Sequence, residues 1–286
     1  MPVTVNFNYS RTIRSARPRR LVRTSDGDTP VIEQPIRMVS CDTPEKGQYA
    51  GNPPVSQPKL DTCRQRLQNG FYDTLPQVLR TYLISKLSND AAQRHISAGH
   101  RASQEFDTVL TNRLTRPDGS LRSVAVIPTG ELIDTYGRLL AYIAPWFSGS
   151  QSDPLPPQGH PDRRTINLDM IENGWAAFFP IYPSLPRNDD MNRAIAAAEV
   201  AWNQRRGVWA EFGDTVLLGY EFRMCIKLGT APNQQNGISE AFQRICVDLR
   251  NMSELGLFGF HAVPPCYRLW IWEDDIAQAR HDLGLN

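Results

Sequence analysis

The sequence lacks any large excess of charge of one sign. Its 286 residues carry 31 lysines and arginines against 30 aspartates and glutamates, which gives a net charge of +1. A histone-like or polybasic DNA-binding protein would be basic over its whole surface, so this composition requires any nucleic-acid site to be local. With 41% hydrophobic residues, the chain can bury a substantial core and is expected to be globular.

Long apolar runs are also missing. No run of about 18 apolar residues occurs, which argues against a membrane span. The arginine-rich N-terminus has no hydrophobic segment behind it, as a cleavable secretory signal would need. We therefore expect a cytoplasmic protein with no membrane partner, although a mature chain that had lost its signal would look the same.

Cysteine and histidine pairs with metal-ligand spacing are absent as well. The five cysteines are odd in number and none forms a CxxC pair, so a disulfide framework or a structural zinc site is not expected. The five histidines show neither HxH nor HxxxH spacing. They are interpreted as surface or core residues.

The first 25 residues are the exception to the balanced charge. They contain no acidic residue, and their arginines are Arg11, Arg14, Arg17, Arg19, Arg20 and Arg23. A flexible arm of this kind would add salt-dependent affinity for phosphates. A solvated tail leading into the first strand is an equally good interpretation. We assign residues 1–19 as a basic N-terminal arm.

Strand and turn signals dominate residues 21–45. Residues 21–25 are predicted to form a strand that enters an Asp-Gly-Asp turn, because Asp and Gly tolerate the backbone of a sharp reversal. Residues 31–32 and 36–39 are predicted to pair with each other across the three residues between them. Together these segments predict a small antiparallel sheet.

A helical region follows. Glycine and proline punctuate residues 47–58, which are predicted to be a loop. Residues 59–114 carry apolar side chains at helical spacing and are predicted to form two or three helices. Breaks are expected near Asn69-Gly70 and between residues 88 and 99.

The second half of the chain alternates strands and helices. Further strands are predicted at residues 122–127, 138–144 and 175–179, with a surface loop at 146–161. Thr165 is predicted to cap a short helix, and Asp189 and Asp190 to open a longer one. Residues after Gly213 are interpreted as a separate stretch that ends in a helix over residues 273–283. Residues 238–249 are equally consistent with helix and strand.

Carboxylates and an arginine gather at the ends of the short apolar runs in residues 26–45. The aspartates are Asp26, Asp28 and Asp42, and the arginine is Arg37. Carboxylate oxygens fixed at strand ends suit a hard divalent cation, and an arginine suits a phosphate. On their own the aspartates would be interpreted as turn-forming residues. Together with the arginine they predict metal-assisted chemistry on a phosphate ester.

Five motifs in order extend this pattern, and with them the chain resembles the staphylococcal nuclease-like (thermonuclease) family. The motifs are Asp26-Gly27-Asp28-Thr29, Arg37 with Asp42-Thr43-Pro44-Glu45, Asp134-Thr135-Tyr136-Gly137-Arg138, Asn173-Gly174-Trp175-Ala176 and Gly207-Val208-Trp209. The resemblance implies an α+β fold with a five-stranded OB-type β-barrel and packed helices. It also implies a cleft that binds Ca²⁺ and a phosphodiester.

The same resemblance implies a role for each matching residue. Asp28 and Asp42 would hold Ca²⁺ through their carboxylates, and Thr43 would hold it through its backbone carbonyl. Glu45 would orient or deprotonate the attacking water.

The substrate contacts are implied in the same way. Arg37 and Arg138 would clamp the phosphate and stabilise the transition state, while Tyr136 and Tyr182 would line the nucleotide pocket. DNA, RNA or both would be the substrate.

The sequence departs from the family pattern in four places. Pro30 follows the first motif where a β-branched residue is more usual, and Pro180 stands where the family often has a pocket tyrosine. Cys41 precedes Asp42 and is interpreted as a small buried strand residue rather than a nucleophile. A helical insertion over about residues 60–115 is much longer than the single helix that the family needs.

These observations predict three parts of the chain. After the basic arm, residues 20–212 would form the nuclease-like domain, and residues 213–286 a small α/β extension of unknown role. The aromatic run at residues 267–272 motivates the hypothesis that this extension forms a homo-oligomer interface. A non-catalytic OB module that binds nucleic acid or protein stays open beside the nuclease. The presence of all the site residues favours the enzyme.

Overall fold

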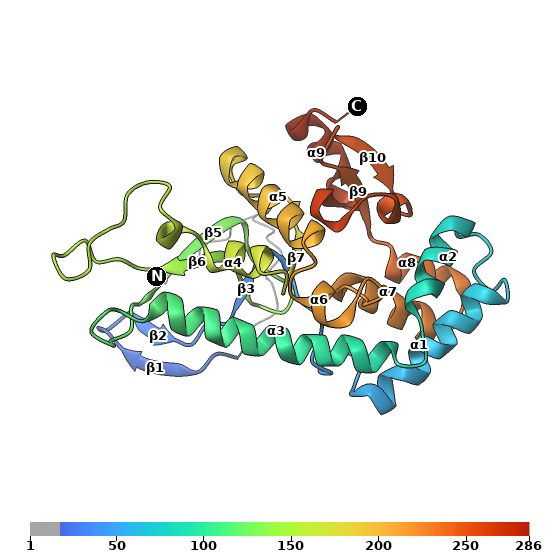
Figure 1. The fold of residues 1–286 in the computed structure, drawn as a ribbon, viewed down its shortest axis with the longest axis horizontal. Coiled ribbons are helices and arrows are strands. Elements are labelled where there is room, and N and C mark those ends of the chain that lie inside the picture. The colour runs from blue at the N-terminus through green and yellow to red at the C-terminus, as the bar shows by residue number, and fades with distance from the viewer. Residues whose placement is uncertain (1–17, 286) are drawn as a thin grey trace, which may run out of the picture.

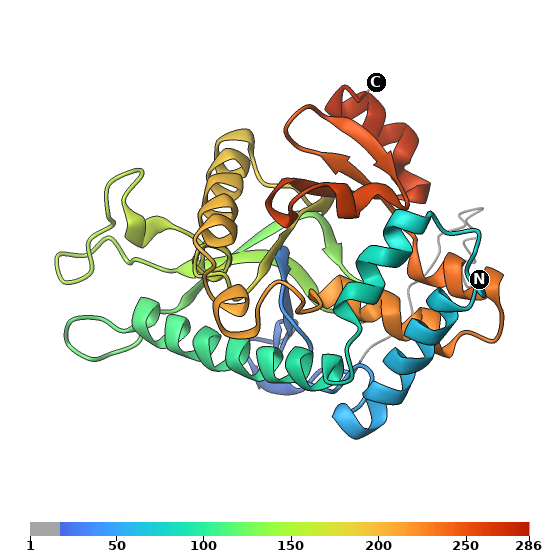
Figure 2. The same ribbon diagram turned by 45° about the vertical axis from the view of Figure 1, so that its right-hand side comes forward.

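The computed structural model describes residues 18–285, so most of the predicted basic arm, including Arg11, Arg14 and Arg17, lies outside the described residues. The predicted α+β class is confirmed. Figure 1 shows the long helix α3 (Ala91–Leu114) running along one side of the molecule, and Figure 2 shows the strands beside it. Within residues 18–285, no helix is both long and apolar enough to cross a membrane.

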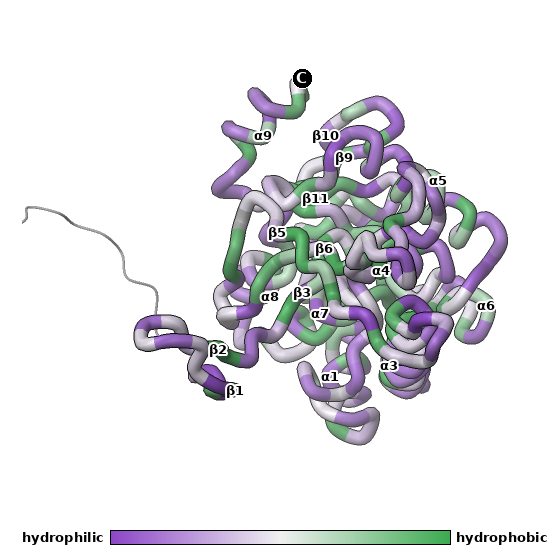
Figure 3. Tube along the Cα trace, turned by 90° about the vertical axis from the view of Figure 1, so that its left-hand side faces the viewer, coloured by the Kyte–Doolittle hydropathy of each residue, from purple (hydrophilic) through white to green (hydrophobic). Residues whose placement is uncertain are grey.

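The first two strands form a hairpin of their own. β1 (Leu21–Thr24) pairs antiparallel with β2 (Pro30–Ile32), so the predicted pairing of residues 31–32 with 36–39 is wrong. The Asp-Gly-Asp turn joins β1 to β2 instead, and Ser25 N donates to Thr29 O across it at 2.9 Å. Figure 3 shows this hairpin standing apart from the rest of the described chain.

Five more strands of the nuclease-like region lie in two further sheets. β3 (Ile36–Met38) pairs in parallel with β6 (Leu139–Pro145), which pairs antiparallel with β5 (Val124–Ile133). β4 (Ser40–Asp42) pairs antiparallel with β7 (Ala177–Phe179). Among the described residues these strands do not join the β1–β2 hairpin, so the five-stranded barrel is not closed.

A backbone kink explains why β3 and β4 enter different sheets. Ser40 adopts a left-handed φ of 58°, which is unusual for a residue other than glycine. Its hydroxyl lies 2.7 Å from the Tyr142 hydroxyl on β6. The chain therefore changes direction between Arg37 and Asp42, and this turn decides which side chains those strands aim at one another.

The helical insertion contains three helices: α1 (Pro53–Gln68), α2 (Gln77–Lys86) and α3. α1 begins six residues before the prediction, because proline is well tolerated in the first turn of a helix, where its missing N–H has no partner to lose. The predicted break between residues 88 and 99 is too long. α3 runs straight through Gly99, whose missing side chain admits the backbone of the Glu45 loop.

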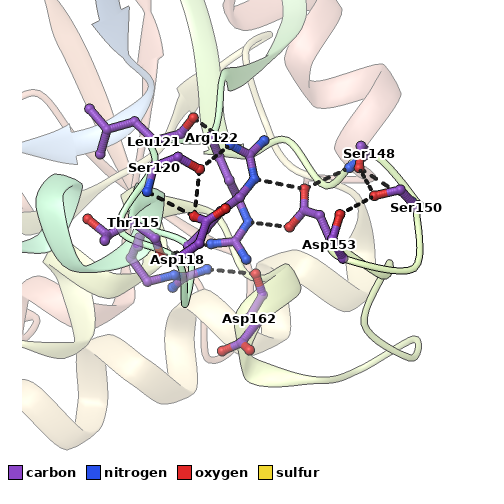
Figure 4. Close-up of polar contacts among 12 residues, drawn as sticks. Thr115, Asp118, Ser120, Leu121, Arg122, Ser148, Ser150, Asp153 and Asp162 are labelled. Atoms are coloured by element: carbon purple, nitrogen blue, oxygen red, sulfur yellow. Dashed lines mark hydrogen bonds and ion pairs between the residues drawn. The ribbon is translucent and has the colours of Figure 1, made fainter.

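The predicted loop at residues 146–161 is held in place by the hydrogen bonds of one buried aspartate. Asp153 is 3% exposed, accepts from Arg122 Nε at 2.8 Å and accepts from Ser148 N at 3.0 Å. Figure 4 shows Asp153 between Arg122 and the serines of the loop. The loop leads through η1 (Pro161–Arg163) to α4 (Ile166–Glu172), which Thr165 caps as predicted by accepting from Leu168 N.

After α4 and β7, one strand and two helices lead into the C-terminal segment. After β8 (Ile181–Tyr182), α5 (Asn188–Asn203) opens with Asp189 and Asp190 in its first turn as predicted. The short helix α6 (Val208–Phe212) follows.

The C-terminal segment is divided between two cores. α7 (Gly219–Thr230) packs against α1 and contributes Phe222 to the main core, and α8 (Gln234–Ala241) follows it. The colours of Figure 1 show α1 and α7 side by side although they come from opposite ends of the sequence. The two readings of residues 238–249 are both partly right, because α8 ends there and β9 begins.

The last three strands and β8 form a separate four-stranded sheet. The order is β10-β9-β11-β8, and the C-terminal strands are β9 (Arg244–Asp248), β10 (Ser253–Gly256) and β11 (Arg268–Trp272). α9 (Ile276–Leu283), shorter than the predicted final helix, covers this sheet with a small apolar core. β11 is the aromatic run that motivated the oligomer hypothesis. Four of its five side chains are buried, so the run offers little exposed surface.

Candidate functional site

Strand β4 places Asp42 at the centre of a buried ionic cluster. Side chains alternate along a strand, so Cys41 faces one side, with its thiol against the Asn167 carbonyl, while Asp42 faces α7. Cys41 is buried as predicted, and burial raises the pKa of its thiol to about 12. Asp42 is only 1% exposed. A buried carboxylate is costly without cationic partners, so the position of Asp42 requires them.

Two arginines supply the partners. Arg37 Nη2 lies 3.1 Å from Asp42 Oδ1. Arg223 Nη2 lies 2.9 Å and 3.0 Å from the two Asp42 oxygens, and Arg223 Nη1 donates to Glu45 Oε1 at 2.6 Å. Burial alone would raise the pKa of Asp42, but the guanidiniums of Arg223 and Arg37 outweigh it and hold that pKa below its usual value. We call Arg37, Asp42, Glu45 and Arg223 the ionic cluster.

Arg223 comes from the C-terminal segment and was missed by the sequence analysis. Gly219 and Arg223 are four residues apart on α7 and therefore share one face of the helix. A Cβ at Gly219 would lie 2.5 Å from the Thr43 carbonyl oxygen and 2.6 Å from Asp42 Oδ2. Only glycine allows so close an approach. A glycine and an arginine one turn apart in an apolar helix were the available signal.

Helix α3 holds the Glu45 loop against α7. Glu45 N donates to His95 Nε2 at 2.9 Å, and His95 Nδ1 lies 2.8 Å from the Leu217 carbonyl oxygen. A neutral imidazole with its proton on Nδ1 satisfies both contacts. The ring is fully buried and stacks on Phe222, with ring centroids 3.9 Å apart. Burial lowers the pKa of His95 to about 3.

This buried histidine predicts a loss of stability in mild acid. In the unfolded chain the imidazole has a pKa of 6.5 and gains a proton below that pH, whereas the folded protein keeps it neutral down to about pH 3. The contribution of His95 to the free energy of unfolding is fully present above about pH 6.5 and decreases as the pH is lowered. A change from about pH 7 to about pH 5 is therefore expected to cost about 2 kcal/mol. Urea unfolding at both pH values measures this cost. His95→Gln should weaken the pH dependence, and a wild-type free energy of unfolding that stays constant over this range would contradict the assignment.

A cavity of about 470 Å³ opens beside the ionic cluster. Its lining includes three cations, Arg37, Lys46 and Arg138, and no acidic residue. Lys46 was missed by the sequence analysis, and its Nζ lies 2.9 Å from Ser103 Oγ on α3. The two arginines predicted to clamp a phosphate therefore line one cavity, although they come from β3 and from the turn before β6. A cavity with this lining attracts an anion.

The turn before β6 orients Arg138. Asp134 Oδ1 accepts from the backbone N–H of Tyr136 and of Arg138, both at 2.9 Å. Its other oxygen lies 2.7 Å from Arg138 Nη2. The guanidinium also lies over the Tyr136 ring, 5.3 Å from its centroid, and Tyr136 itself is 72% exposed. The predicted pocket tyrosine and the predicted clamp arginine are therefore neighbours on the surface.

Arg244 adds a further positive charge close to the cluster. Its guanidinium lies between two rings, 5.1 Å from the centroid of Phe179 and 4.5 Å from that of Trp272. Burial and the nearby charges of Arg223 and Arg37 lower the pKa of Arg244 to about 10. Arg244 therefore adds a third arginine to the two, Arg37 and Arg223, that surround Asp42.

Two predicted site residues lie apart from the ionic cluster. Asp28 is exposed in the turn of the β1–β2 hairpin, where its carboxylate accepts from the Thr29 hydroxyl. Tyr182 is buried in the second core, and its hydroxyl donates to Asp282 at 2.6 Å. The structure thus brings Arg37, Asp42 and Glu45 together, and places Asp28 and Tyr182 elsewhere.

The residues predicted to hold Ca²⁺ do not form a coordination shell in this arrangement. Both oxygens of Asp42 accept from arginine, the Thr43 carbonyl lies under Gly219, and Asp28 is on the hairpin. Ca²⁺ needs about six to eight oxygen ligands. Within residues 18–285, no group of three or more His, Cys, Asp or Glu side chains could hold a metal ion. As arranged, the donor set does not fit a divalent cation.

Comparison with known families gives one match. The family model described as staphylococcal nuclease homologue matches residues 35–211, which is more than half of the chain. The matched region contains Arg37, Asp42, Glu45 and Arg138, and it leaves out Asp28 and the whole of α7. A search of curated proteins finds no match.

Proposed function

The chain belongs to the staphylococcal nuclease family, and we propose on that basis that it hydrolyses phosphodiester bonds in DNA, RNA or both. The observation that carries this proposal is the cavity lined by Arg37, Lys46 and Arg138 without an acidic residue. A phosphodiester carries one negative charge, and arginine can bind two of its oxygens at once. The cavity lies beside Glu45, the candidate partner of the attacking water.

The chemistry assigned to these residues is in-line attack of water on phosphorus. The water oxygen forms a new bond to phosphorus, and the water's proton passes to a Glu45 oxygen. The ester P–O bond breaks, and the leaving nucleotide oxygen takes a proton from solvent water. Arg37 and Arg138 donate hydrogen bonds to phosphate oxygens whose charge grows in the transition state, and this stabilises that state more than the ground state. Asp42 and Asp134 act indirectly, because each fixes one of these arginines through an ion pair.

The resemblance also predicts Ca²⁺ bound to Asp28, Asp42 and Thr43. The arrangement of the described residues does not fit that ion, so the hydrolytic step above is assigned to protein groups alone. Ca²⁺ dependence remains a prediction of its own. Nuclease assays with added Ca²⁺ and with chelator test it separately from hydrolysis.

The two tyrosines have unequal support as nucleotide-pocket residues. Tyr136 is exposed beside Arg138, so its ring is free to stack on a base. Tyr182 is packed in the second core and hydrogen-bonded to Asp282. We retain the proposed role for Tyr136, and Tyr182 would need local rearrangement to reach a base.

The proposal is tested by degradation of DNA and RNA by the wild type and by Glu45→Gln. The amide cannot accept a proton, so the rate is expected to fall by about 10²-fold or more. Glu105→Gln is the matched control, since Glu105 pairs with Arg101 on α3 and is not among the residues that line the cavity, so this variant should keep wild-type activity. Equal rates for Glu45→Gln and the wild type would overturn the role of Glu45.

A binding module without catalysis is the second candidate. It is favoured by the ion pair between Glu45 and Arg223. Glu45 is the carboxylate that the nuclease proposal assigns to the attacking water, and this ion pair already occupies one of its two oxygens. This function predicts that the protein binds single-stranded DNA or RNA and leaves it intact, with Ca²⁺ and with chelator alike. Such a result would overturn the nuclease proposal.

A further inference from the structure

Arg223 makes the contacts that a divalent cation would otherwise make in the ionic cluster. Its guanidinium donates to both Asp42 oxygens and to Glu45, at 2.9 Å, 3.0 Å and 2.6 Å. The Arg223 side chain is 22% exposed and the Asp42 side chain is fully buried. A planar guanidinium suits this task because its N–H groups point in fixed directions toward neighbouring carboxylates.

We propose that Arg223 is the built-in cation of this site: it takes the place of a divalent metal on Asp42 and Glu45, so that the chain binds Ca²⁺ weakly while Arg223 is present. The proposal deepens the proposed function, since it assigns the cation of the same site. It concerns metal affinity, which is measured without substrate.

Charge and space both support this assignment. Arg37 and Arg223 already balance the two carboxylates of the cluster, so an added divalent ion would face two nearby positive charges. Gly219 also lies over Asp42 Oδ2 and the Thr43 carbonyl, two of the three donor groups that the resemblance assigns to the metal. A metal could reach them only if α7 moved away.

The position of α7 is fixed at both of its ends. At its start, the buried Glu221 carboxylate lies 2.6 Å from Lys86 Nζ on α2. At its end, the Leu228 carbonyl accepts from Arg66 and from Tyr72, both at 2.7 Å. Arg223 is therefore carried by a helix that is part of the core and is held by polar contacts at both of its ends.

Metal titration of the full chain tests the proposal. Ca²⁺ binding is measured by calorimetry, and Tb³⁺ luminescence serves as a second probe, for the wild type, Arg223→Met and Arg280→Met. Arg223→Met removes the competing charge and keeps most of the side-chain volume, so its affinity for Ca²⁺ should rise by about tenfold or more. Arg280 pairs with Glu254 at a distant surface site, and Arg280→Met should bind Ca²⁺ as weakly as the wild type.

Two further measurements keep the proposal open to refutation if Arg223→Met does not fold. Arg223→Lys keeps the charge and should retain the weak binding of the wild type. The wild type should melt at the same temperature in millimolar Ca²⁺ and in chelator, because an ion that bound the folded protein would raise its melting temperature. A rise of several degrees with Ca²⁺ in the wild type, or a folded Arg223→Met that binds no tighter than the wild type, would overturn the proposal. Neither measurement uses nucleic acid, so a failure here is distinct from a failure of the proposed nuclease activity.

Discussion

Replacing Arg37 by methionine is expected to lower kcat for DNA or RNA hydrolysis by about 10²–10³-fold. Arg37 lines the cationic cavity and is held there by its ion pair with Asp42. A donor whose hydrogen bond strengthens as charge builds on the phosphate oxygens contributes mainly in the transition state. The loss should therefore appear chiefly in kcat, with a smaller change in KM.

The prediction for Arg37 can be separated from a folding defect. Asp42 keeps two hydrogen bonds to Arg223 when Arg37 is removed, so its charge stays compensated and the fold should survive. Circular dichroism and urea unfolding check this. Arg250→Met is the control, because Arg250 pairs with Asp248 on β9 and lies outside the cavity lining. A kcat within a few-fold of the wild type in a folded Arg37→Met protein would contradict the assignment of Arg37 to the phosphate.

Local sequence patterns predicted much of the site because its first half is contiguous. Arg37, Asp42 and Glu45 lie on two adjoining strands and the loop that follows, so their spacing alone brings them close together. The Thr165 cap and the acidic first turn of α5 were predictable for the same reason: hydrogen bonds near a helix start involve residues three or four positions apart. Arg138 was assigned to the site by the family motif, and in the structure it lines the same cavity as Arg37.

The unpredicted half of the site depends on tertiary packing. Arg223 reaches Asp42 because α7 packs against α1 and places Gly219 against the Thr43 carbonyl and the Asp42 carboxylate. No local sequence pattern predicts this contact between residues so far apart in the chain. The prediction that residues 31–32 pair with residues 36–39 failed because the sequence offered two possible partners. A strong turn signal lies on each side of residues 30–32, and the tighter Asp-Gly-Asp turn determines the partner of β2.

A buried ionic hub underlies the placement of α7 and hence of Arg223. Glu221 is completely buried and accepts from Lys86 Nζ, from the Tyr82 hydroxyl and from the Leu218 backbone N–H. Arg268 Nη1 on β11 lies 3.6 Å from the same carboxylate. Burial alone would raise the pKa of Glu221, but Lys86 and Arg268 outweigh it and lower that pKa, so the group stays ionised. One carboxylate thus joins the helical insertion, α7 and the C-terminal sheet.

Glu221→Gln is therefore expected to destabilise the protein by about 3–5 kcal/mol, because it leaves Lys86 and Arg268 as buried cations without a counter-charge. Urea unfolding monitored by circular dichroism measures the change. The control Glu254→Gln breaks the ion pair with Arg280 near the surface and should cost less than about 1 kcal/mol. Adding Lys86→Met to Glu221→Gln removes one of the uncompensated charges, so the double variant should recover part of the loss and reveal the coupling between the two residues. If Glu221→Gln costs no more than the surface control, the hub does not hold α7 in place, and the position of Arg223 must then depend on the other contacts of α7, which include its packing on α1 and the hydrogen bonds to the Leu228 carbonyl.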